Sequence, residues 1–303
     1  MDKIEEIKVL CAKYGIRPSK DRGQNFVIEP RAIERMVEAA DISPEDFVVE
    51  IGPGFGVLTT ALAKRAKKVL AVEVDGKLAQ ALKDSPLFRR TVLELVQGDV
   101  LKMSNEELVK TVARDFMSRP GGTQGAALHE AKTLPYKVVS NLPYSITSKV
   151  LRKFTEFDPK PTIMVLMVQK EVAERVCARP GEMSILSVAV QYYAKPEIIA
   201  YVARDAFWPE PEVESAILRI TITPSQSPPY IKGEKIAVDE KRLFQIVRIG
   251  FSSRRKQLQN NLTAGLHISR QQAFEALKKV GLPETVRPQE LSVPNWIALT
   301  EVL

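Results

Sequence analysis

The chain of 303 residues is 45% hydrophobic and carries a formal net charge of +7. Its apolar content excludes an intrinsically disordered chain, and its length predicts one domain of about 200 residues with a smaller second domain. Two cysteines cannot build a disulfide framework, and two histidines argue against histidine catalysis and against a histidine metal site. We therefore expect no metal. The sequence has no signal-peptide core and no apolar run of membrane-spanning length, so we expect a cytoplasmic protein without a membrane partner.

The positive charge is concentrated toward the C-terminus. Residues 239–279 contain nine Lys and Arg against three acidic residues. A polyanion such as a nucleic acid would be attracted to this segment. Solvated helix faces would give the same composition, so both interpretations stay open at this point.

Strands and helices alternate along the first half of the chain. After a helical N-terminal segment, Pro30 opens a helix at the first position, where proline is tolerated. Predicted strands cover 46–52, 67–75, 91–99, 136–141 and 162–169, and predicted helices cover 30–40, 56–66, 76–85, 105–117 and 145–154. The strands are continuous runs rich in Val, Ile and Leu, which is typical of a parallel sheet covered on both faces. The sequence therefore predicts an α/β fold with a Rossmann-like sheet and helices on both faces.

The pattern changes at two further places. Residues 117–134 contain three glycines and a proline without periodicity, which predicts an inserted surface loop. Residues 225–230 read as a linker, and from residue 239 onward the pattern is helical, including the segment SRRKQLQNNL at 253–262. We therefore divide the chain into an α/β domain, 1–224, and a smaller helical domain, 225–303.

A glycine-rich turn follows the first strand. Gly52, Gly54 and Gly56 have the spacing G-x-G-x-G, and Val57 fills the next position. This differs from the G-x-G-x-x-G of dinucleotide binders, whose longer loop holds a pyrophosphate at a helix N-terminus. The turn favours a ligand without phosphates, although a tight turn with no ligand would show the same glycines.

Acidic residues end the second and third strands. Ligands of open parallel sheets lie outside the carboxyl ends of the strands. Glu73 can accept both hydroxyls of a ribose, and Asp99 can accept a hydrogen bond from the amino group of an adenine. Alone, Glu73 could be a surface acid and Asp99 a helix N-cap. Together with the glycine turn they outline an adenosine without phosphates, for which S-adenosylmethionine is the candidate.

The fourth strand ends in Asn141-Leu142-Pro143-Tyr144. Methyl transfer to an exocyclic amine of a base requires positioning above all, because the cofactor is already reactive. The side-chain carbonyl of Asn141 and the main-chain carbonyl of Leu142 can accept the two N–H bonds of the amine. Pro143 stiffens the turn, and Tyr144 offers a ring on which the base can stack. A strand-to-helix turn with a buried tyrosine is the structural alternative. The position after three cofactor sites favours catalysis.

Several motifs in order resemble the ribosomal small-subunit adenine dimethyltransferases of the bacterial KsgA type. They are GQNF (23–26), EIGPGFG (50–56), EVD (73–75), NLPY (141–144), FWPEPEVESA (207–216) and FSSRRKQLQNNL (251–262). The resemblance runs from about residue 13 to the C-terminus. It implies dimethylation of two adjacent adenosines near the 3′ end of small-subunit rRNA, within a pre-ribosomal particle. We expect a monomer.

The resemblance also implies roles for single residues. Asn25 and Val27 would contact the methionine and ribose end of S-adenosylmethionine, and Asn141 would touch the cofactor as well as the amine. Phe207 would sandwich the extruded base against Tyr144.

In the helical domain, Arg254, Arg255 and Lys256 would grip rRNA phosphates. Ser145 and Val27 depart from the usual family residues, which are Asn and Leu, but neither change removes a catalytic group. Three rival functions remain: a large-subunit rRNA adenine methyltransferase, a non-catalytic assembly or transcription factor that keeps the fold, and a DNA adenine methyltransferase.

Overall fold

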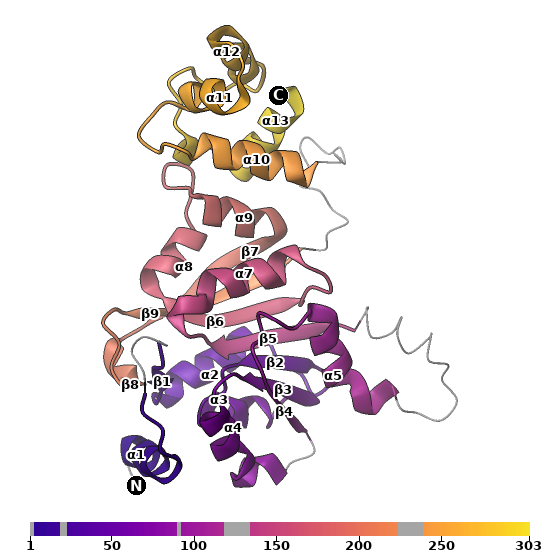
Figure 1. Ribbon diagram of the computed structural model, residues 1–303, viewed down its shortest axis with the longest axis vertical. Helices are drawn as coiled ribbons and strands as arrows, with labels where there is room; N and C mark the ends of the chain where they lie inside the picture. Colours follow the sequence, from indigo (N-terminus) through magenta and orange to yellow (C-terminus); the bar gives the residue numbers. More distant parts are fainter. Residues whose placement is uncertain (1–2, 19–22, 90–91, 118–133, 224–238) are drawn as a thin grey trace. The chain divides into compact units, whose positions relative to one another are not determined.

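The computed structural model describes residues 3–18, 23–89, 92–117, 134–223 and 239–303 (Figure 1). The predicted insertion at 117–134 therefore lies almost wholly outside the described residues. The chain forms two compact units, the first made of Met1–Ala173 with Pro196–Ile222 and the second of Glu174–Lys195 with Thr223–Leu303. The second unit thus includes Glu174–Lys195 in addition to the predicted domain 225–303.

The first unit is built around a seven-stranded sheet with the order β4-β3-β2-β5-β6-β9-β7. Its strands are β2 (Phe47–Ile51), β3 (Lys68–Glu73), β4 (Leu93–Gln97), β5 (Tyr136–Asn141), β6 (Ile163–Gln169), β7 (Ala194–Val202) and β9 (Ser215–Ile222). The strands β2 to β6 pair in parallel, as predicted. The strand β9, for which the sequence predicted no direction, pairs with β6 in the antiparallel sense. The alternation of strand and helix, from which parallel pairing follows, stops before β9.

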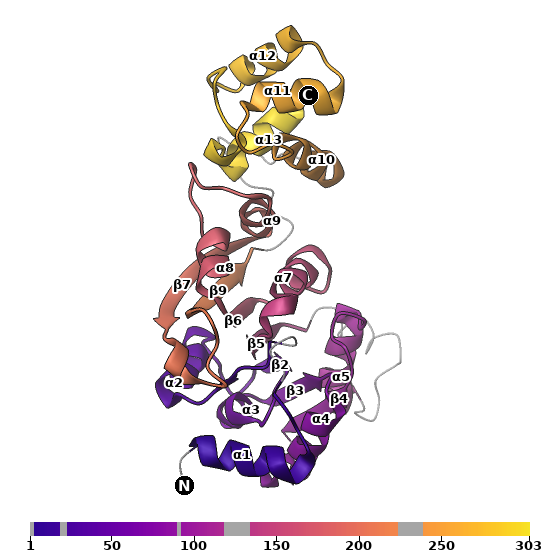
Figure 2. The same cartoon turned by 60° about the vertical axis from the view of Figure 1, so that its left-hand side comes forward.

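Helices cover both faces of this sheet, which confirms the predicted fold class. In Figure 2 the helices α2 and α5 lie on opposite sides of the strands. The helices of the unit are α1 (Lys3–Tyr14), α2 (Pro30–Ala39), α3 (Val57–Leu62), α4 (Gly76–Lys83), α5 (Asn105–Met117) and α7 (Thr147–Glu156), and the short helix η2 (Tyr144–Ile146) precedes α7.

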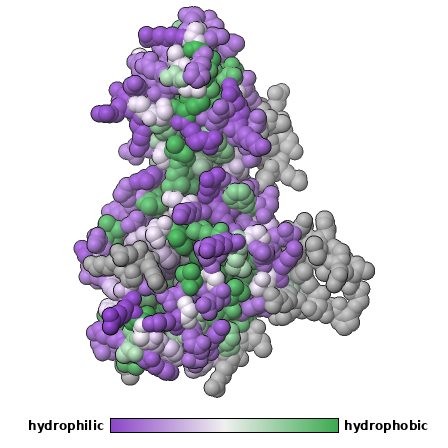
Figure 3. Space-filling view, in the orientation of Figure 1, coloured by the Kyte–Doolittle hydropathy of each residue, from purple (hydrophilic) through white to green (hydrophobic). Residues whose placement is uncertain are grey.

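Alternate strand residues form the core on one face. Val48, Val69 and Val165 are fully buried and belong to one cluster with Met36 of α2 and Leu62 of α3. Within a strand, every second residue belongs to this cluster, as Val69 and Ala71 of β3 do. Successive side chains of a strand point to opposite faces, which gives this two-residue period. At the surface shown in Figure 3, hydrophilic side chains surround scattered apolar ones, as is usual for a protein with its core inside.

A short antiparallel pair that the sequence did not predict joins two distant motifs. The strand β1 (Phe26–Val27) pairs with β8 (Phe207–Trp208), so that Phe26 lies opposite Trp208 and Val27 opposite Phe207. The pair brings the GQNF segment beside the FWPEP segment. Two-residue strands carry no periodicity, and therefore only the tertiary structure reveals them.

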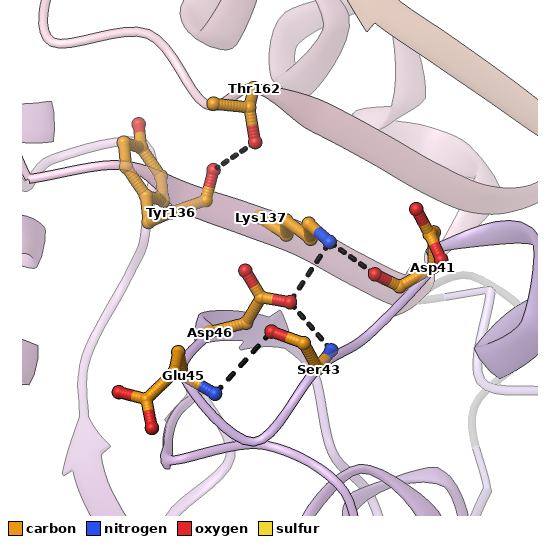
Figure 4. Close-up of polar contacts among 7 residues, drawn as sticks. All are labelled: Asp41, Ser43, Glu45, Asp46, Tyr136, Lys137 and Thr162. Atoms are coloured by element: carbon orange, nitrogen blue, oxygen red, sulfur yellow. Dashed lines mark hydrogen bonds and ion pairs between the residues drawn. The ribbon is translucent and has the colours of Figure 1, made fainter.

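A partly buried ion pair lies at the amino end of the sheet (Figure 4). The Nζ atom of Lys137 donates to the main-chain carbonyl of Asp41 and lies 3.0 Å from Oδ2 of Asp46. The same oxygen accepts from the amide of Ser43 at 2.7 Å. Burial raises the pKa of Asp46, but the hydrogen bonds from Ser43 and Lys137 outweigh it and hold the pKa below its ordinary value. This cluster stabilises the turn before β2, at the end of the strands opposite to their carboxyl ends.

The second unit is helical. It contains α9 (Ile185–Tyr193), α10 (Glu240–Gly250), α11 (Leu258–Leu266), α12 (Arg270–Lys279), η4 (Pro288–Glu290) and α13 (Val293–Val302), and α8 (Lys170–Val176) spans the boundary between the units. Met183 and Val188 belong to its core with Trp296, which is why Glu174–Lys195 joins this unit. The predicted helix at 253–262 begins only at Leu258. None of the helices described is long and apolar enough to cross a membrane.

Candidate functional site

A cavity of about 420 Å³ opens at the carboxyl ends of the strands in the first unit. Its volume falls in the range of about 300–1,000 Å³ that is usual for small-molecule sites. Seven of the predicted site residues line it together: Asn25, Gly52, Gly54, Glu73, Asp99, Asn141 and Pro143. They come from four strand ends and from the segment before β1. The arrangement matches the rule that ligands of open α/β sheets bind outside the carboxyl strand ends.

The glycine turn brings main chain to the cavity. Gly54 has φ 56°, in the left-handed region, and a Cβ atom placed on it would lie 3.0 Å from the Phe26 ring. Gly56 has φ 79°, and its Cβ atom would lie 2.7 Å from Leu82. Both positions therefore need glycine for conformation and for space. Gly54 therefore lets the main chain approach Phe26 on the cavity wall more closely than a side chain would allow.

Glu73 is buried and holds the glycine turn. One carboxylate oxygen accepts from the amide of Gly54 at 3.3 Å and the other from the amide of Asp75 at 2.9 Å. Burial raises the pKa of Glu73, and these two hydrogen bonds offset that effect only in part. A carboxylate has about four acceptor positions, so Glu73 keeps capacity for the hydroxyl groups of a ligand.

Asp99 lines the cavity and also caps a turn. Its Oδ1 atom accepts from the amide of Leu101 at 3.0 Å, and its carbonyl accepts from the amide of Lys102 at 2.9 Å. The capped segment is the turn at 99–102 and not the helix α5, which begins at Asn105. The capping role and a ligand-binding role can therefore share one carboxylate.

The side chain of Asn141 is oriented by a main-chain group. Its Nδ2 atom donates to the carbonyl of Asn25 at 2.8 Å. The Oδ1 atom of the same amide then remains as an acceptor at the cavity. Leu142 is buried, and its amide donates to the carbonyl of Met167 at 3.2 Å, which anchors the turn on β6. The segment before β1 packs closely here, because a Cβ atom on Gly23 would lie 3.1 Å from the amide nitrogen of Tyr144.

Four predicted site residues lie outside the cavity lining. Tyr144 is half-buried and its hydroxyl lies 2.7 Å from Oγ of Ser215, while burial raises its pKa despite that hydrogen bond. Leu142, Val27 and Phe207 are buried, and Phe207 is only 3% exposed. The side chains of Val27 and Phe207 belong to the core cluster because the β1–β8 pair faces it. The structure thus brings neither side chain into the cavity, and their predicted roles stay predictions.

Other lining residues were missed by the sequence analysis. Val74 follows Glu73 and is 68% exposed, the largest exposed fraction among the large hydrophobic side chains described. Ile146 and Lys149 line the cavity from η2 and α7. Val74 directly follows Glu73 in the predicted strand 67–75, and Ile146 and Lys149 lie near the start of the predicted helix 145–154, so only their nearness to predicted site residues could have indicated them.

Glu50 has an unusual environment beneath the glycine turn. It is 1% exposed, and its Oε2 atom makes no hydrogen bond with the described residues. Burial and, to a smaller extent, the charge of Glu73 raise its pKa, hydrogen bonding with Thr59 lowers it, and the net pKa is about 8. This pKa predicts that Glu50 keeps its proton at neutral pH.

The predicted rRNA-binding residues lie in the second unit. Arg254, Arg255 and Lys256 are exposed in the turn between α10 and α11. Arg254 donates from Nη2 to the carbonyl of Met183 at 3.4 Å, and the ion pairs among the described residues involve none of the three. Their charge is therefore available to a polyanion.

Comparison with known proteins identifies the chain's relatives. The ribosomal RNA small subunit methyltransferase A of Dehalococcoides mccartyi is 38% identical over 297 residues, which cover 97% of this chain and 91% of that protein. The protein of the same name from Alkaliphilus metalliredigens is 36% identical and covers 99% of this chain and 98% of its own.

Solved structures agree with the fold. The 23S rRNA methyltransferase ErmE is 26% identical with a TM-score of 0.66, covering 92% of this chain and 99% of that one. A dimethyladenosine transferase from Plasmodium falciparum is 24% identical with a TM-score of 0.70, covering 90% and 95% of the two chains, and shares the fold. The family model described as ribosomal RNA adenine dimethylase matches residues 17–301. The chain therefore belongs to the ribosomal RNA adenine dimethylase family.

Proposed function

We propose that this rRNA adenine dimethyltransferase uses S-adenosylmethionine in the described cavity. The substrates would be two adjacent adenosines near the 3′ end of small-subunit rRNA, each methylated twice on its exocyclic amine within a pre-ribosomal particle. One observation carries the proposal: the amide of Asn141 is held by Asn25 at 2.8 Å, in a cavity that Glu73 and Asp99 also line.

The residues present fit this cofactor. Glu73 would hold the ribose hydroxyls, Asp99 the adenine amino group, and Asn25 the methionine end. Two carboxylates and one lysine, Lys149, are the charged side chains among the lining residues described, which suits a cationic ligand without phosphates. When bound, S-adenosylmethionine supplies a methyl group that is activated by its positive sulfur.

The turn at 141–144 would position the acceptor amine. Since Nδ2 of Asn141 is occupied by the Asn25 carbonyl, its Oδ1 is the atom that accepts one N–H of the adenine. The main-chain carbonyl of Leu142 would accept the other. These two acceptors would hold the N–H bonds so that the nitrogen lone pair is withdrawn from conjugation with the ring and directed at the methyl group. The nitrogen would then lose one of its protons, because the new N–C bond makes the amine acidic. Positioning of this kind supplies several kcal/mol of the barrier without a general base.

The base must leave its stack to reach these atoms. An adenine inside an RNA helix cannot present its amine to a cavity at the rim of a sheet, so the target is single-stranded or extruded. The ring of Tyr144 would support the extruded base, fixed by the hydrogen bond of its hydroxyl to Ser215. We propose that Arg254, Arg255 and Lys256 bind rRNA phosphates from the helical unit.

Methyl transfer by the variant Asn141→Ala tests the proposal. We expect loss of transfer of labelled methyl groups to small subunits that lack the modification, with binding to those subunits changed by less than about twofold. Asn105→Ala is the matched control, because Asn105 is also an amide that donates to main-chain carbonyls, those of Lys153 and Phe157, but away from the cavity. Turnover by Asn141→Ala comparable with the control would refute the role of Asn141. Failure of the wild-type protein to transfer methyl groups would favour a non-catalytic factor.

A large-subunit substrate is the second candidate, because the ErmE structure covers 92% of this chain. The chain is 36% and 38% identical to the two small subunit methyltransferases but 26% identical to ErmE, and this difference supports a small-subunit substrate. Mass spectrometry of both rRNAs from cells with and without this gene separates the two. Loss of dimethyladenosine from the large-subunit rRNA alone would overturn the small-subunit assignment.

A further inference from the structure

The basic triplet of the second unit lies on a turn that is held by a buried side chain. The segment 251–257 leaves α10 at Gly250 and enters α11 at Leu258, and it carries Arg254, Arg255 and Lys256. The sequence predicted a helix through 253–257. A turn here must satisfy the last carbonyls of α10 by other means, because a helix leaves its final carbonyl groups without partners.

Asn261 provides that partner. Its side chain is 4% exposed, and its Nδ2 atom donates to the carbonyl of Gly250 at 2.5 Å and to the carbonyl of Ser253 at 2.9 Å. The amide group of an asparagine has two donor hydrogens, so both are used. One side chain on α11 thereby joins the end of α10 to the residue just before the basic triplet.

Packing holds the two ends of the same turn. A Cβ atom on Gly250 would lie 2.3 Å from the Trp296 ring, and the Phe251 and Trp296 ring centroids are 5.6 Å apart. At the other end, the amide of Leu258 donates to the carbonyl of Val286 at 2.8 Å. Between these anchors, the carbonyl of Ser253 accepts both from the side chain of Asn261 and from the amide of Lys256, the latter at 3.2 Å. Asn261 thereby contributes a side-chain hydrogen bond that holds the main chain at Ser253.

We propose that Asn261 is a positioning residue for rRNA binding. It holds the 251–257 turn so that Arg254, Arg255 and Lys256 present their charges in one arrangement before RNA arrives. Without Asn261, the turn would be mobile in the free protein and would become ordered only when RNA binds. Ordering the loop and its long side chains costs free energy, and this cost would weaken binding. Asn261 is buried and cannot itself contact RNA, so its effect passes through the three basic side chains. The inference rests on the proposed function of that triplet.

The test compares two buried amides of the same helix. Asn261→Leu removes both donors at similar volume. Gln259→Leu is the matched control, because Gln259 is also buried and its Nε2 atom donates to the carbonyl of Arg270 at 3.1 Å, away from the basic turn. The kcat and KM of methyl transfer to unmodified small subunits are measured at several salt concentrations, together with the urea midpoint of each variant. If Asn261→Leu does not fold, Asn261→Ser, which keeps a donor of shorter reach, takes its place.

For Asn261→Leu we expect KM to rise about tenfold, while kcat stays within about twofold of the wild-type value. The slope of log KM against the logarithm of the salt concentration should decrease by about 0.9, the amount that corresponds to one lost phosphate contact. Gln259→Leu should lower the urea midpoint and leave KM unchanged. An unchanged KM and salt slope in the Asn261 variant would overturn the inference, as would an equal rise of KM in both variants. If the wild-type protein transfers no methyl groups, the proposed function fails. The variants are then compared by direct binding to the subunits, where unchanged affinity of the Asn261 variant overturns the positioning role.

Discussion

The raised pKa of Glu50 leads to a prediction about stability. Glu50 is 1% exposed and its pKa is raised to about 8, mainly by burial, from 4.5. Between these two values the folded protein keeps a proton that the unfolded chain releases. The free energy of unfolding therefore falls as the pH rises through this window, by about 1.4 kcal/mol for each pH unit. The change Glu50→Gln removes the titration and keeps a neutral side chain of the same shape.

The variant should therefore be more stable than the wild type, increasingly so at higher pH. Because pH 7 lies about 2.5 units above the ordinary pKa, the gain there is about 3 kcal/mol, and at pH 4 it is near zero. Urea unfolding of both proteins at pH 4, 5, 6, 7 and 8 measures the difference. Glu45→Gln is the control, since the side chain of Glu45 is 81% exposed and should give no trend of this size. A difference between Glu50→Gln and wild type that does not change with pH would refute the reasoning.

Three further predictions concern other parts of the structure. Lys137→Met removes the ion-pair partner of Asp46 and leaves the hydrogen bond from the Ser43 amide, and it should cost about 1–3 kcal/mol at pH 7. Because the folded pKa of Asp46 is lowered from 3.8, its contribution is present above that value and is lost as the pH falls through the folded pKa, so unfolding curves of the two proteins should converge at low pH. Gly54→Ala strains a residue with φ 56° and crowds Phe26, and calorimetry should show S-adenosylmethionine binding weakened by about tenfold or more; unchanged binding would argue against the cavity as its site. Reversing the charges at 254–256 should weaken binding to small subunits and flatten its salt dependence in filter-binding assays, and an unchanged slope would contradict the role of this turn.

Much of the α/β unit could be predicted from local patterns. Continuous apolar runs such as those of β2 and β5 are buried on both faces, so each strand was visible without knowledge of its neighbours. The ends of those strands then placed Gly52, Glu73, Asp99 and Asn141 at one edge of a sheet, and the structure has all four in one cavity lining.

Other features depend on contacts between distant residues. Val27 and Phe207 were predicted site residues because of their motifs, and their roles stay predictions. Only the register of the β1–β8 pair shows that both side chains belong to the core cluster. The antiparallel β9 and the inclusion of Glu174–Lys195 in the helical unit likewise had no local signal.

The sequence by itself determined the alternation of strands and helices, the chemistry at the strand ends, and the resemblance that identified the family, because each is written in residues close together in the chain. The tertiary structure alone decided how Asn141 is oriented, since its partner Asn25 is 116 residues away. It also decided that the basic segment at 254–256 is a turn, since Asn261 and Trp296 fix it through contacts that helical periodicity does not contain. Local propensity selects the elements, but hydrogen bonds and packing between elements select the orientation of the side chains that act.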